Sequence, residues 1–96
     1  MWRCSWDPRK DALNRRKHGV AFAVAATVLD DPLALMGYDR NQSGEDRWRM
    51  IGRSIDGETL VIVFAIRDGE DEEIVRIISA RHALRGERVA YEQQAH

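Results

Sequence analysis

The stretch that decides the fold is Arg47-Trp48-Arg49-Met50-Ile51-Gly52-Arg53-Ser54-Ile55-Asp56-Gly57-Glu58-Thr59-Leu60-Val61-Ile62-Val63-Phe64-Ala65-Ile66-Arg67. Its two halves are rich in β-branched and aromatic residues, which favour strands. Asp56-Gly57 separates the halves and is a strong signal for a hairpin with a two-residue turn. We therefore predict two antiparallel strands, over residues 47–55 and 59–67.

Further strands are predicted on both sides of this hairpin. Strand-like segments cover residues 33–38 and 74–81, and the acidic stretch 68–72 joins the last segment to the hairpin. Strands that follow one another through short connections form an antiparallel meander, which can bury one face and leave the other available. The sequence thus predicts a four-stranded antiparallel sheet.

A first helix is predicted over residues 8–18. Asp7 can accept hydrogen bonds from free amides, and Pro8 suits the first helical position. Gly19 is a natural helix stop.

Two more helices complete the predicted fold. The small apolar residues 20–29 indicate a second, mostly buried helix, and residues 83 to about 93 form the last one. Leu84 and Tyr91 are seven residues apart, so we expect them on one face of it. The order of elements, two helices, four strands and a helix, is that of a single α+β domain over residues 1–96.

Alternation of side chains along the strands predicts how the two faces of the sheet divide. With a two-residue turn and a symmetric acidic loop, one face carries an arginine row among apolar residues. The row is made of Arg47, Arg49, Arg53 and Arg76, and the apolar residues are Ile51, Ile62, Phe64 and Ile78. The other face carries Trp48, Met50, Val61, Val63, Ala65, Val75 and Ile77, with Arg67 and Arg81 near its ends. We predict that the second face is the core. Arg76 and Arg81, five residues apart, then point to opposite faces.

The composition fits a small globular protein and excludes several classes. Hydrophobic residues make up 44% of the chain and charged residues 32%, which is ordinary for globular domains. Cys4 is the only cysteine, so neither an internal disulfide nor a cysteine-based zinc site can form. The longest apolar run, 60–66, is too short for a membrane helix, and residues 1–5 are no hydrophobic signal segment. We therefore expect a cytoplasmic protein.

Arginine dominates the basic residues, since Lys10 and Lys17 are the only lysines among fifteen. Arginine suits bidentate recognition of phosphate. An open sheet face that combines guanidinium groups with apolar patches suits single-stranded RNA, whose phosphates and bases are both accessible. The alternative is that the arginines form ordinary cross-strand pairs with the acidic residues Asp39, Glu45, Asp46 and those of the 68–72 loop.

Several short motifs, each weak alone, are specific as an ordered set. They are Trp6-Asp7-Pro8-x-Lys10, Asn14, Lys17-His18-Gly19-Val20 with Phe22, Ala25, Val28, Asp31-Pro32, Arg47, Ile51-Gly52, Arg67, Arg76-Ile77-Ile78-Ser79-Ala80-Arg81, Glu87 and Tyr91-Glu92. On these residues the chain resembles the BrnT family of toxins from bacterial type II toxin–antitoxin systems.

Three features depart from the pattern of that family. Ala21 stands where relatives commonly carry a Ser or Thr that can cap the second helix. His82 replaces a basic residue that many relatives have, and the acidic tract 68–73 is longer than usual.

The resemblance implies a RelE-like ribonuclease fold and inhibition of translation by RNA cleavage. It also implies a BrnA-type antitoxin that binds DNA and neutralises the toxin, so that any contact of the toxin with DNA is indirect. Both a homodimer of the toxin and a heterotetramer with the antitoxin are open.

Metal-free RNA cleavage needs activation of the ribose 2′-OH, stabilisation of the charge on the phosphorane and protonation of the leaving oxygen. Arginine serves the second need best. The candidate catalytic residues are Arg67, Arg76, Arg81, Lys17 and His18. The candidate RNA-binding residues are Arg47, Arg49, Arg53 and Tyr91. No cluster of His, Asp and Glu has the spacing of metal ligands, so we expect no metal or other cofactor.

Each of these roles has a structural alternative. His18 ends a helix beside Gly19, where a cation interacts favourably with the helix dipole. Tyr91 suits core packing, as do Trp6 and Trp48. Glu45 and Glu87 could be general bases or salt-bridge partners, and His82 could approach the same cleft as Arg81. For the whole chain, the alternative to an RNA-cleaving toxin is a non-catalytic module whose arginine-bearing face binds an acidic partner protein.

Overall fold

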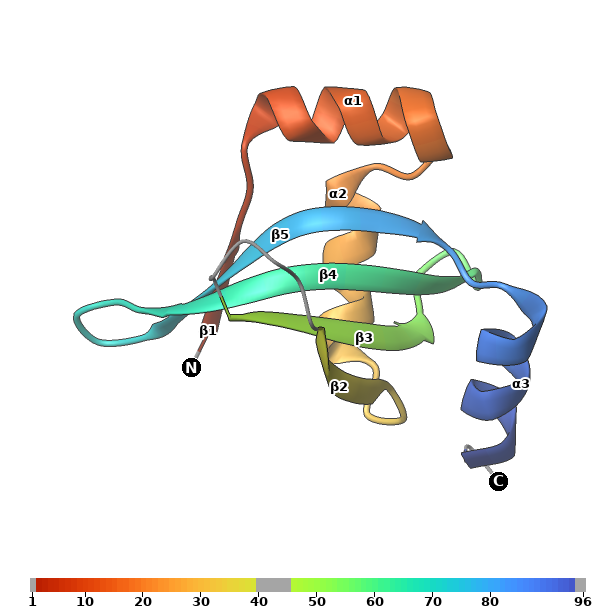
Figure 1. Ribbon diagram of the computed structural model, residues 1–96. Coiled ribbons are helices and arrows are strands. Elements are labelled where there is room, and N and C mark those ends of the chain that lie inside the picture. The colour runs from red at the N-terminus through yellow and green to blue at the C-terminus, as the bar shows by residue number, and fades with distance from the viewer. Residues whose placement is uncertain (1, 40–45, 95–96) are drawn as a thin grey trace.

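The computed structural model describes residues 2–39 and 46–94, which form a five-stranded mixed sheet with helices (Figure 1). Its strands are β1 (Trp2–Ser5), β2 (Leu35–Asp39), β3 (Arg47–Arg53), β4 (Thr59–Asp68) and β5 (Glu73–His82). Its helices are α1 (Pro8–His18), α2 (Phe22–Ala25), the 3₁₀ helix η1 (Ala26–Asp30) and α3 (Arg85–Gln94). The strand order is β1-β5-β4-β3-β2. No helix in the described ranges is long and apolar enough to cross a membrane.

The α+β class and the antiparallel meander of β2 to β5 are confirmed, but the prediction of four strands is wrong. A fifth strand, β1, pairs parallel to β5, with Trp2 opposite Glu73 and Ser5 opposite Arg76. This strand has only four residues and no alternating pattern. Its partner residues in β5 are about 70 positions away along the chain, so nothing local in the sequence signals the pairing.

Helix α1 has the predicted bounds because both of its ends are capped. The Asp7 side chain accepts from the backbone N–H of Arg9 at 2.9 Å. Gly19 adopts the left-handed conformation at φ 71° and its N–H donates to the carbonyl of Arg15. A side chain at position 19 would be strained there.

The predicted second helix is correct in place but not in form, since it divides into one α turn and a 3₁₀ segment. Ala21 precedes α2 without any side-chain cap. Asp11 of α1 supplies one instead, because its carboxylate accepts from the N–H of Phe22 at 2.9 Å. The first two helices are therefore joined by a hydrogen bond that replaces the missing local one.

The β3–β4 hairpin has a register one residue away from the predicted one. Its loop has three residues rather than two: the N–H of Ser54 donates to the carbonyl of Glu58, and Gly57 takes the left-handed conformation at φ 86°. A three-residue loop with glycine at its last position is the next commonest solution for a hairpin. As a result Arg49 lies opposite Val63, not Phe64.

Strand β5 carries a bulge that the sequence analysis also missed. Val63 lies opposite Ser79 and Phe64 opposite Ile77, so Ile78 is an extra residue on β5. One extra residue reverses the alternation beyond it. Arg76 and Arg81 therefore point to the same face of the sheet, and the prediction of opposite faces is wrong.

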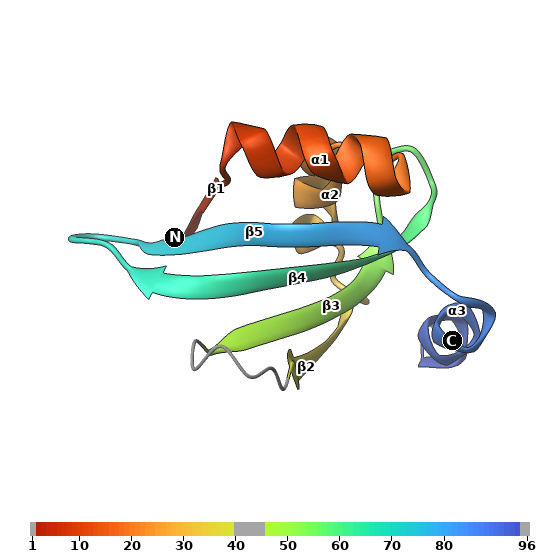
Figure 2. The ribbon, with the colours of Figure 1, turned by 45° about the horizontal axis from the view of Figure 1, so that its top comes forward.

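These two changes exchange the predicted faces of β4, whereas Trp48 and Met50 of β3 and Val75 and Ile77 of β5 lie on the core side as predicted. Helices α2 and η1 cover one face (Figure 2), and the core between them contains Val20, Phe22, Ala25, Val28, Leu60, Ile62, Phe64, Val75, Ile77 and Ala80. Ile62 and Phe64 were predicted on the arginine side, and Val61, Val63 and Ala65 in the core. The opposite holds. Trp6 and Trp48 pack against this core, as their structural alternative predicted.

Helix α3 lies beyond the end of the strands (Figure 1). Tyr91 is buried, whereas Leu84 precedes the helix and is 65% exposed. The expected apolar pair on one face of this helix is therefore wrong. Leu84 instead donates its backbone N–H to Glu87 Oε1 at 2.8 Å, which is the backward half of a capping box.

Candidate functional site

The face of the sheet opposite α2 and η1 carries the arginines, and we call it the arginine face. Registers across β3, β4 and β5 place Arg49 in line with Val63 and Ser79, and Arg81 in line with Val61. Arg76 lies opposite Ala65 on the same face. The predicted residues that it brings together are Arg47, Arg49, Arg53, Arg67, Arg76 and Arg81.

Beneath the arginines lies an apolar floor. Val61 and Ala65 are each 2% exposed although α2 and η1 cover the opposite face. Their cross-strand neighbours are Arg81 and Arg76, which are half-buried. Arginine stems cover apolar surface while their head groups stay near water. The Nε atom of Arg76 is buried, so its side chain lies along the sheet rather than away from it.

Arg81 forms a two-pronged ion pair with Glu87 of α3. Its Nη1 donates to Oε1 at 2.8 Å and its Nη2 to Oε2 at 2.9 Å. Two parallel bonds are the strongest geometry between a guanidinium and a carboxylate. The same fork could hold two oxygens of a phosphate, so Glu87 occupies the donors that a phosphate would use.

This pair changes the protonation of both partners. The hydrogen bonds from Arg81 are the main reason that the pKa of Glu87 is lowered to about 2. The N–H of Leu84 and the charge of Arg49 also lower this pKa, whereas burial acts to raise it. The hydrogen bonds to Glu87 raise the pKa of Arg81. A carboxylate of such low pKa is a weak proton acceptor at neutral pH. The salt-bridge alternative therefore describes Glu87.

Arg67 lies at the other end of the arginine face, opposite Ile74. Six residues of β4 separate it from Val61, the neighbour of Arg81, which corresponds to about 20 Å along the strand. The two arginines cannot hold one phosphate. At this end of the sheet, Glu72 of the acidic tract lies 3.4 Å from the guanidinium of Arg3.

The remaining RNA-binding candidates differ in their exposure. Arg49 is exposed on the arginine face, and Arg47 lies opposite Asp39 in the β2–β3 ladder. The expected pairing of Arg47 with an acid is thus compatible with the register. Glu45 lies outside the described residues. Asp46 accepts from the hydroxyl of Tyr38 at 3.0 Å.

Tyr91 lies between α3 and the sheet with only 4% of its surface exposed. Its hydroxyl donates to Asp31 Oδ2 at 2.6 Å, and the Arg53 guanidinium lies 5.8 Å from the ring centre. The hydrogen bond to Asp31 raises the pKa of Tyr91. Burial acts to raise the pKa of Asp31, but hydrogen bonds from the Arg53 N–H, the Tyr91 hydroxyl and the Leu33 N–H outweigh burial, so that the pKa of Asp31 is lowered. This placement agrees with the core-packing alternative for Tyr91.

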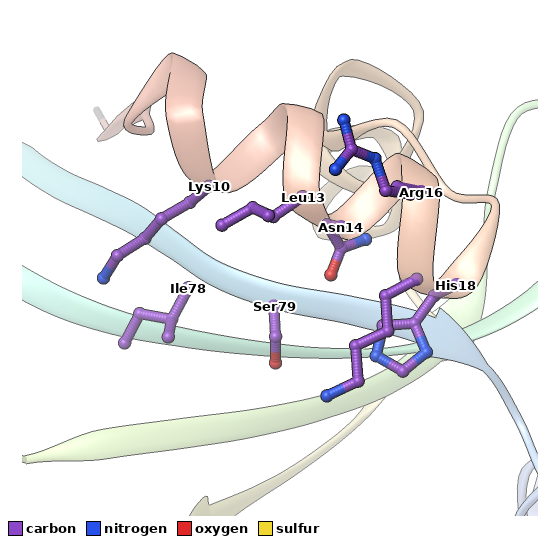
Figure 3. A pocket seen from close by; sticks show the side chains of 8 residues that line it. Lys10, Leu13, Asn14, Arg16, His18, Ile78 and Ser79 are labelled. Atoms are coloured by element: carbon purple, nitrogen blue, oxygen red, sulfur yellow. The ribbon is translucent and has the colours of Figure 1, made fainter.

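Lys17 and His18 line a hollow of about 530 Å³ between α1 and β5, together with Lys10, Leu13, Asn14, Arg16, Ile78 and Ser79. Figure 3 shows that the His18 ring lies near the C-terminal end of β5, above the same strand that carries Arg81. Ile78 and Ser79 reach the hollow because of the bulge in β5. Sequence reasoning missed this part of the site, and only the spacing of Lys10, Leu13 and Lys17 along one helix face could have signalled it.

Two other sequence features lie elsewhere. His82 pairs with Leu60, whose side chain is in the core, so it is on the opposite face from Arg81. The idea that His82 approaches the cleft of Arg81 is therefore wrong. Among residues 2–39 and 46–94, no three His, Cys, Asp or Glu side chains gather in an arrangement that could hold a metal ion.

Comparison with known proteins points in one direction. No curated protein sequence matches the chain. The crystal structure of the Brucella abortus ribonuclease toxin BrnT matches its fold with a TM-score of 0.58 and 24% sequence identity, over 88% of this chain and 99% of that one. The family model described as ribonuclease toxin, BrnT, of type II toxin–antitoxin system matches residues 6–87. Since that match spans most of the sequence, this chain belongs to the BrnT family of ribonuclease toxins.

Proposed function

We propose that the arginine face binds single-stranded RNA and cleaves it without a metal ion. The observation that carries this proposal is the position of Arg49, Arg76 and Arg81 on one face above the apolar floor of Val61 and Ala65. Guanidinium groups hold phosphates, and apolar surface between them accepts unstacked bases.

In the proposed mechanism, Arg81 and Arg76 stabilise the charge that develops on the phosphorane. Arg81 has the stronger claim because its fork is already arranged for two oxygen atoms by Glu87. Arg67 lies too far along β4 to share that phosphate, so it holds a neighbouring one. Lys17 adds a cation at the α1 edge.

His18 is the candidate that takes the proton of the ribose 2′-OH as the 2′-oxygen attacks the adjacent phosphorus. The bond from phosphorus to the 5′-oxygen then breaks, and the leaving 5′-oxygen takes a proton from water. His18 is half-buried at the edge of the arginine face, and histidine is the side chain that most often serves as a general base. Arg47, Arg49 and Arg53 bind flanking phosphates. Tyr91 contributes by holding α3 and Arg53 in place rather than by stacking on a base.

Membership of a type II toxin–antitoxin family implies a protein antitoxin as partner. We propose that a BrnA-type antitoxin inserts acidic side chains into the arginine face, as Glu87 does within the chain. The toxin would meet DNA only through that antitoxin, either as a homodimer that binds antitoxin or within a heterotetramer.

The chain, as one domain over residues 1–96 with a RelE-like fold, would act in the cytoplasm and inhibit translation.

Purified protein and short single-stranded RNA test this proposal. We expect cleavage without added metal, and Arg81→Ala should lower its rate by about 10²- to 10³-fold, the usual effect of removing a donor to transition-state charge. Arg85→Ala is the matched control, since Arg85 is an exposed residue at the start of α3. Unfolding curves show whether each variant is folded. If Arg76→Ala and Arg81→Ala both cleave like the unmodified protein, the site assignment is wrong.

The same experiment separates the toxin from a non-catalytic module that binds an acidic protein. Glu87 on Arg81 favours such a partner as well, because it demonstrates that a carboxylate fits there. Both functions predict loss of antitoxin binding in Arg81→Ala. Only the toxin also cleaves RNA and arrests growth when it is expressed without its antitoxin.

A further inference from the structure

The hollow between α1 and β5 has apolar walls within a ring of cations. Leu13 forms one wall and is 61% exposed, and Ile78 forms the opposite wall (Figure 3). Lys10 lies three residues before Leu13 and Lys17 four residues after it, which is about one helical turn on either side. A single exposed leucine needs no explanation, but one that faces a second apolar side chain across a hollow does.

Two features fix the shape of this hollow. Asn14, which is 6% exposed, donates to the carbonyls of Ala80 and Val20 and accepts from the Ala80 N–H, so α1 is held against β5. Ile78 is the extra residue of the β5 bulge. The helix and the bulge therefore lie on opposite sides of the hollow, and the space between them is preformed.

The charges around the hollow are of one sign. Lys10, Arg16, Lys17 and His18 line it, and none of the described acidic residues does. Asp11 of the same helix is directed away, since it accepts from Phe22 and lies 3.8 Å from Arg15. Seven residues separate the two lysines, which places their Cα atoms about 10 Å apart along the helix.

The hollow is continuous with the arginine face. Ser79 lines it and lies opposite Val63, which in turn lies opposite Arg49. A strand of RNA that crosses the sheet along this row arrives directly at the two lysines. The hollow is therefore the natural next position for a nucleotide beyond the arginines.

We propose that this hollow binds one nucleotide of the RNA strand, with the base between Leu13 and Ile78 and the adjoining phosphates beside Lys10 and Lys17. The inference rests on the proposed RNA binding and extends it to a subsite next to the cleavage site. The two side chains that would contact the base, Leu13 and Ile78, are aliphatic, so the subsite accepts different bases and contributes affinity rather than sequence preference.

Binding of short single-stranded 2′-O-methyl RNA, measured by fluorescence anisotropy over a range of salt concentrations, tests this subsite. That RNA lacks the attacking hydroxyl and is bound without cleavage. Lys10→Gln should weaken binding by about three- to tenfold and lower the slope of log affinity against log salt by about 0.7. Leu13→Ala should weaken binding by about threefold and leave the slope unchanged, because it removes apolar contact only.

Two control variants lie outside the hollow. Arg9→Gln removes one charge from an exposed position of the same helix, and Ile55→Ala truncates an apolar side chain that is 80% exposed at the hairpin tip. Arg9→Gln should change RNA binding less than Lys10→Gln does, and Ile55→Ala should change it less than Leu13→Ala does. Arg9→Gln with the same effect as Lys10→Gln would mean that helix charge acts only at long range, which overturns the subsite.

The subsite and the proposed function fail in different ways. If unmodified protein binds RNA, Arg81→Ala weakens it, and the hollow variants match their controls, the subsite is wrong and the arginine face stands. If the unmodified protein binds no RNA, both are wrong. If Lys10→Gln and Leu13→Ala weaken binding of the antitoxin but not of RNA, the hollow is a protein-docking site and the inference is overturned.

Discussion

The arginine face is bordered by two helices that are attached in different ways. At the β5 edge, α1 is held by the buried amide of Asn14, which carries no charge, and the lysines of α1 pair with none of the described residues. At the end of the strands, α3 is held by Glu87, whose carboxylate occupies the fork of Arg81. Attachment of α1 through neutral hydrogen bonds leaves its cations available for a ligand. Attachment of α3 through an ion pair means that a ligand must compete with Glu87 for the guanidinium of Arg81.

The largest effect is expected at the α1 edge, from Asn14→Ala. This change removes three buried hydrogen bonds and leaves the N–H and carbonyl of Ala80 and the carbonyl of Val20 unsatisfied. Each buried polar group without a partner costs about 1–3 kcal/mol. We expect a loss of about 3 kcal/mol or more in the free energy of unfolding, measured by urea denaturation.

Leu13→Ala is the matched comparison for that change. Leu13 is adjacent in sequence but 61% exposed, so its truncation should change stability by no more than about 0.5 kcal/mol. A loss below about 1 kcal/mol in Asn14→Ala would show that α1 is attached by other contacts. The contrast between the two borders of the face would then disappear.

The second effect is expected at α3, from Glu87→Gln. Glutamine can still accept from Leu84 but loses the ion pair with Arg81. The variant should lose about 1 kcal/mol at pH 7, less than the full pKa change would give, because the Arg81 side chain is 35% exposed and solvent screens the pair. The same variant should bind RNA several-fold more tightly, because Arg81 is released and a negative charge is removed.

The pH dependence of stability checks the cause of that loss. The folded pKa of Glu87 is about 2, below its ordinary value of 4.5, so the carboxylate contributes stability at neutral pH that is lost as the pH falls from about 4.5 to about 2. The difference between the unmodified protein and Glu87→Gln should shrink over this window. A difference that stays constant down to pH 2 would mean that the ion pair is not its origin.

The sequence predicted the elements of this fold better than the faces of its sheet. The caps at Asp7 and Gly19 and the apolar run around Phe64 are local signals, and α1 and β4 were predicted within a residue or so. The face on which a side chain lies depends on register. The hairpin loop includes Ile55 in addition to Asp56 and Gly57, and Ile78 is an extra residue in β5. Each of these moves the pairing by one position, and neither has a strong local signal.

The candidate site was predicted in part for the same reason. The arginines were recognised by residue type, and the errors in register placed Arg81 on the wrong face although it was the right residue. The hollow at α1 depends on contact between Asn14 and Ala80, which are 66 residues apart. Such a contact cannot be inferred from periodicity. Likewise the ion pair of Arg81 with Glu87 needs the position of α3 relative to the sheet.

Tyr91→Phe removes another attachment of α3, and its expected effect on stability is at least as large as that of Glu87→Gln. The ring stays buried, but the hydrogen bond of 2.6 Å to Asp31 is lost. We expect a loss of about 1–2 kcal/mol in the free energy of unfolding, since the acceptor is charged. Tyr38→Phe is the control: its hydroxyl also donates to a carboxylate, that of Asp46, but the residue is 53% exposed. Equal losses in the two variants would show that burial of the Asp31 bond adds nothing.

The smallest effect is expected from Ala21→Ser, back at the α1 edge. Ala21 is the residue before α2, has the extended backbone of an N-cap at φ −79° and ψ 142°, and makes no side-chain cap. A serine there can accept from the free N–H of Ala23, which typically stabilises a helix by about 0.5–1 kcal/mol. Thermal unfolding should show a higher midpoint for Ala21→Ser than for Ala23→Ser, whose exposed hydroxyl caps nothing.

Because Asp11 already accepts from Phe22, the stability gained from Ala21→Ser should become larger in the background of Asp11→Ala. Additive effects of the two changes would mean that the cap supplied by α1 and the local cap act independently, and that α1 does not compensate for the alanine.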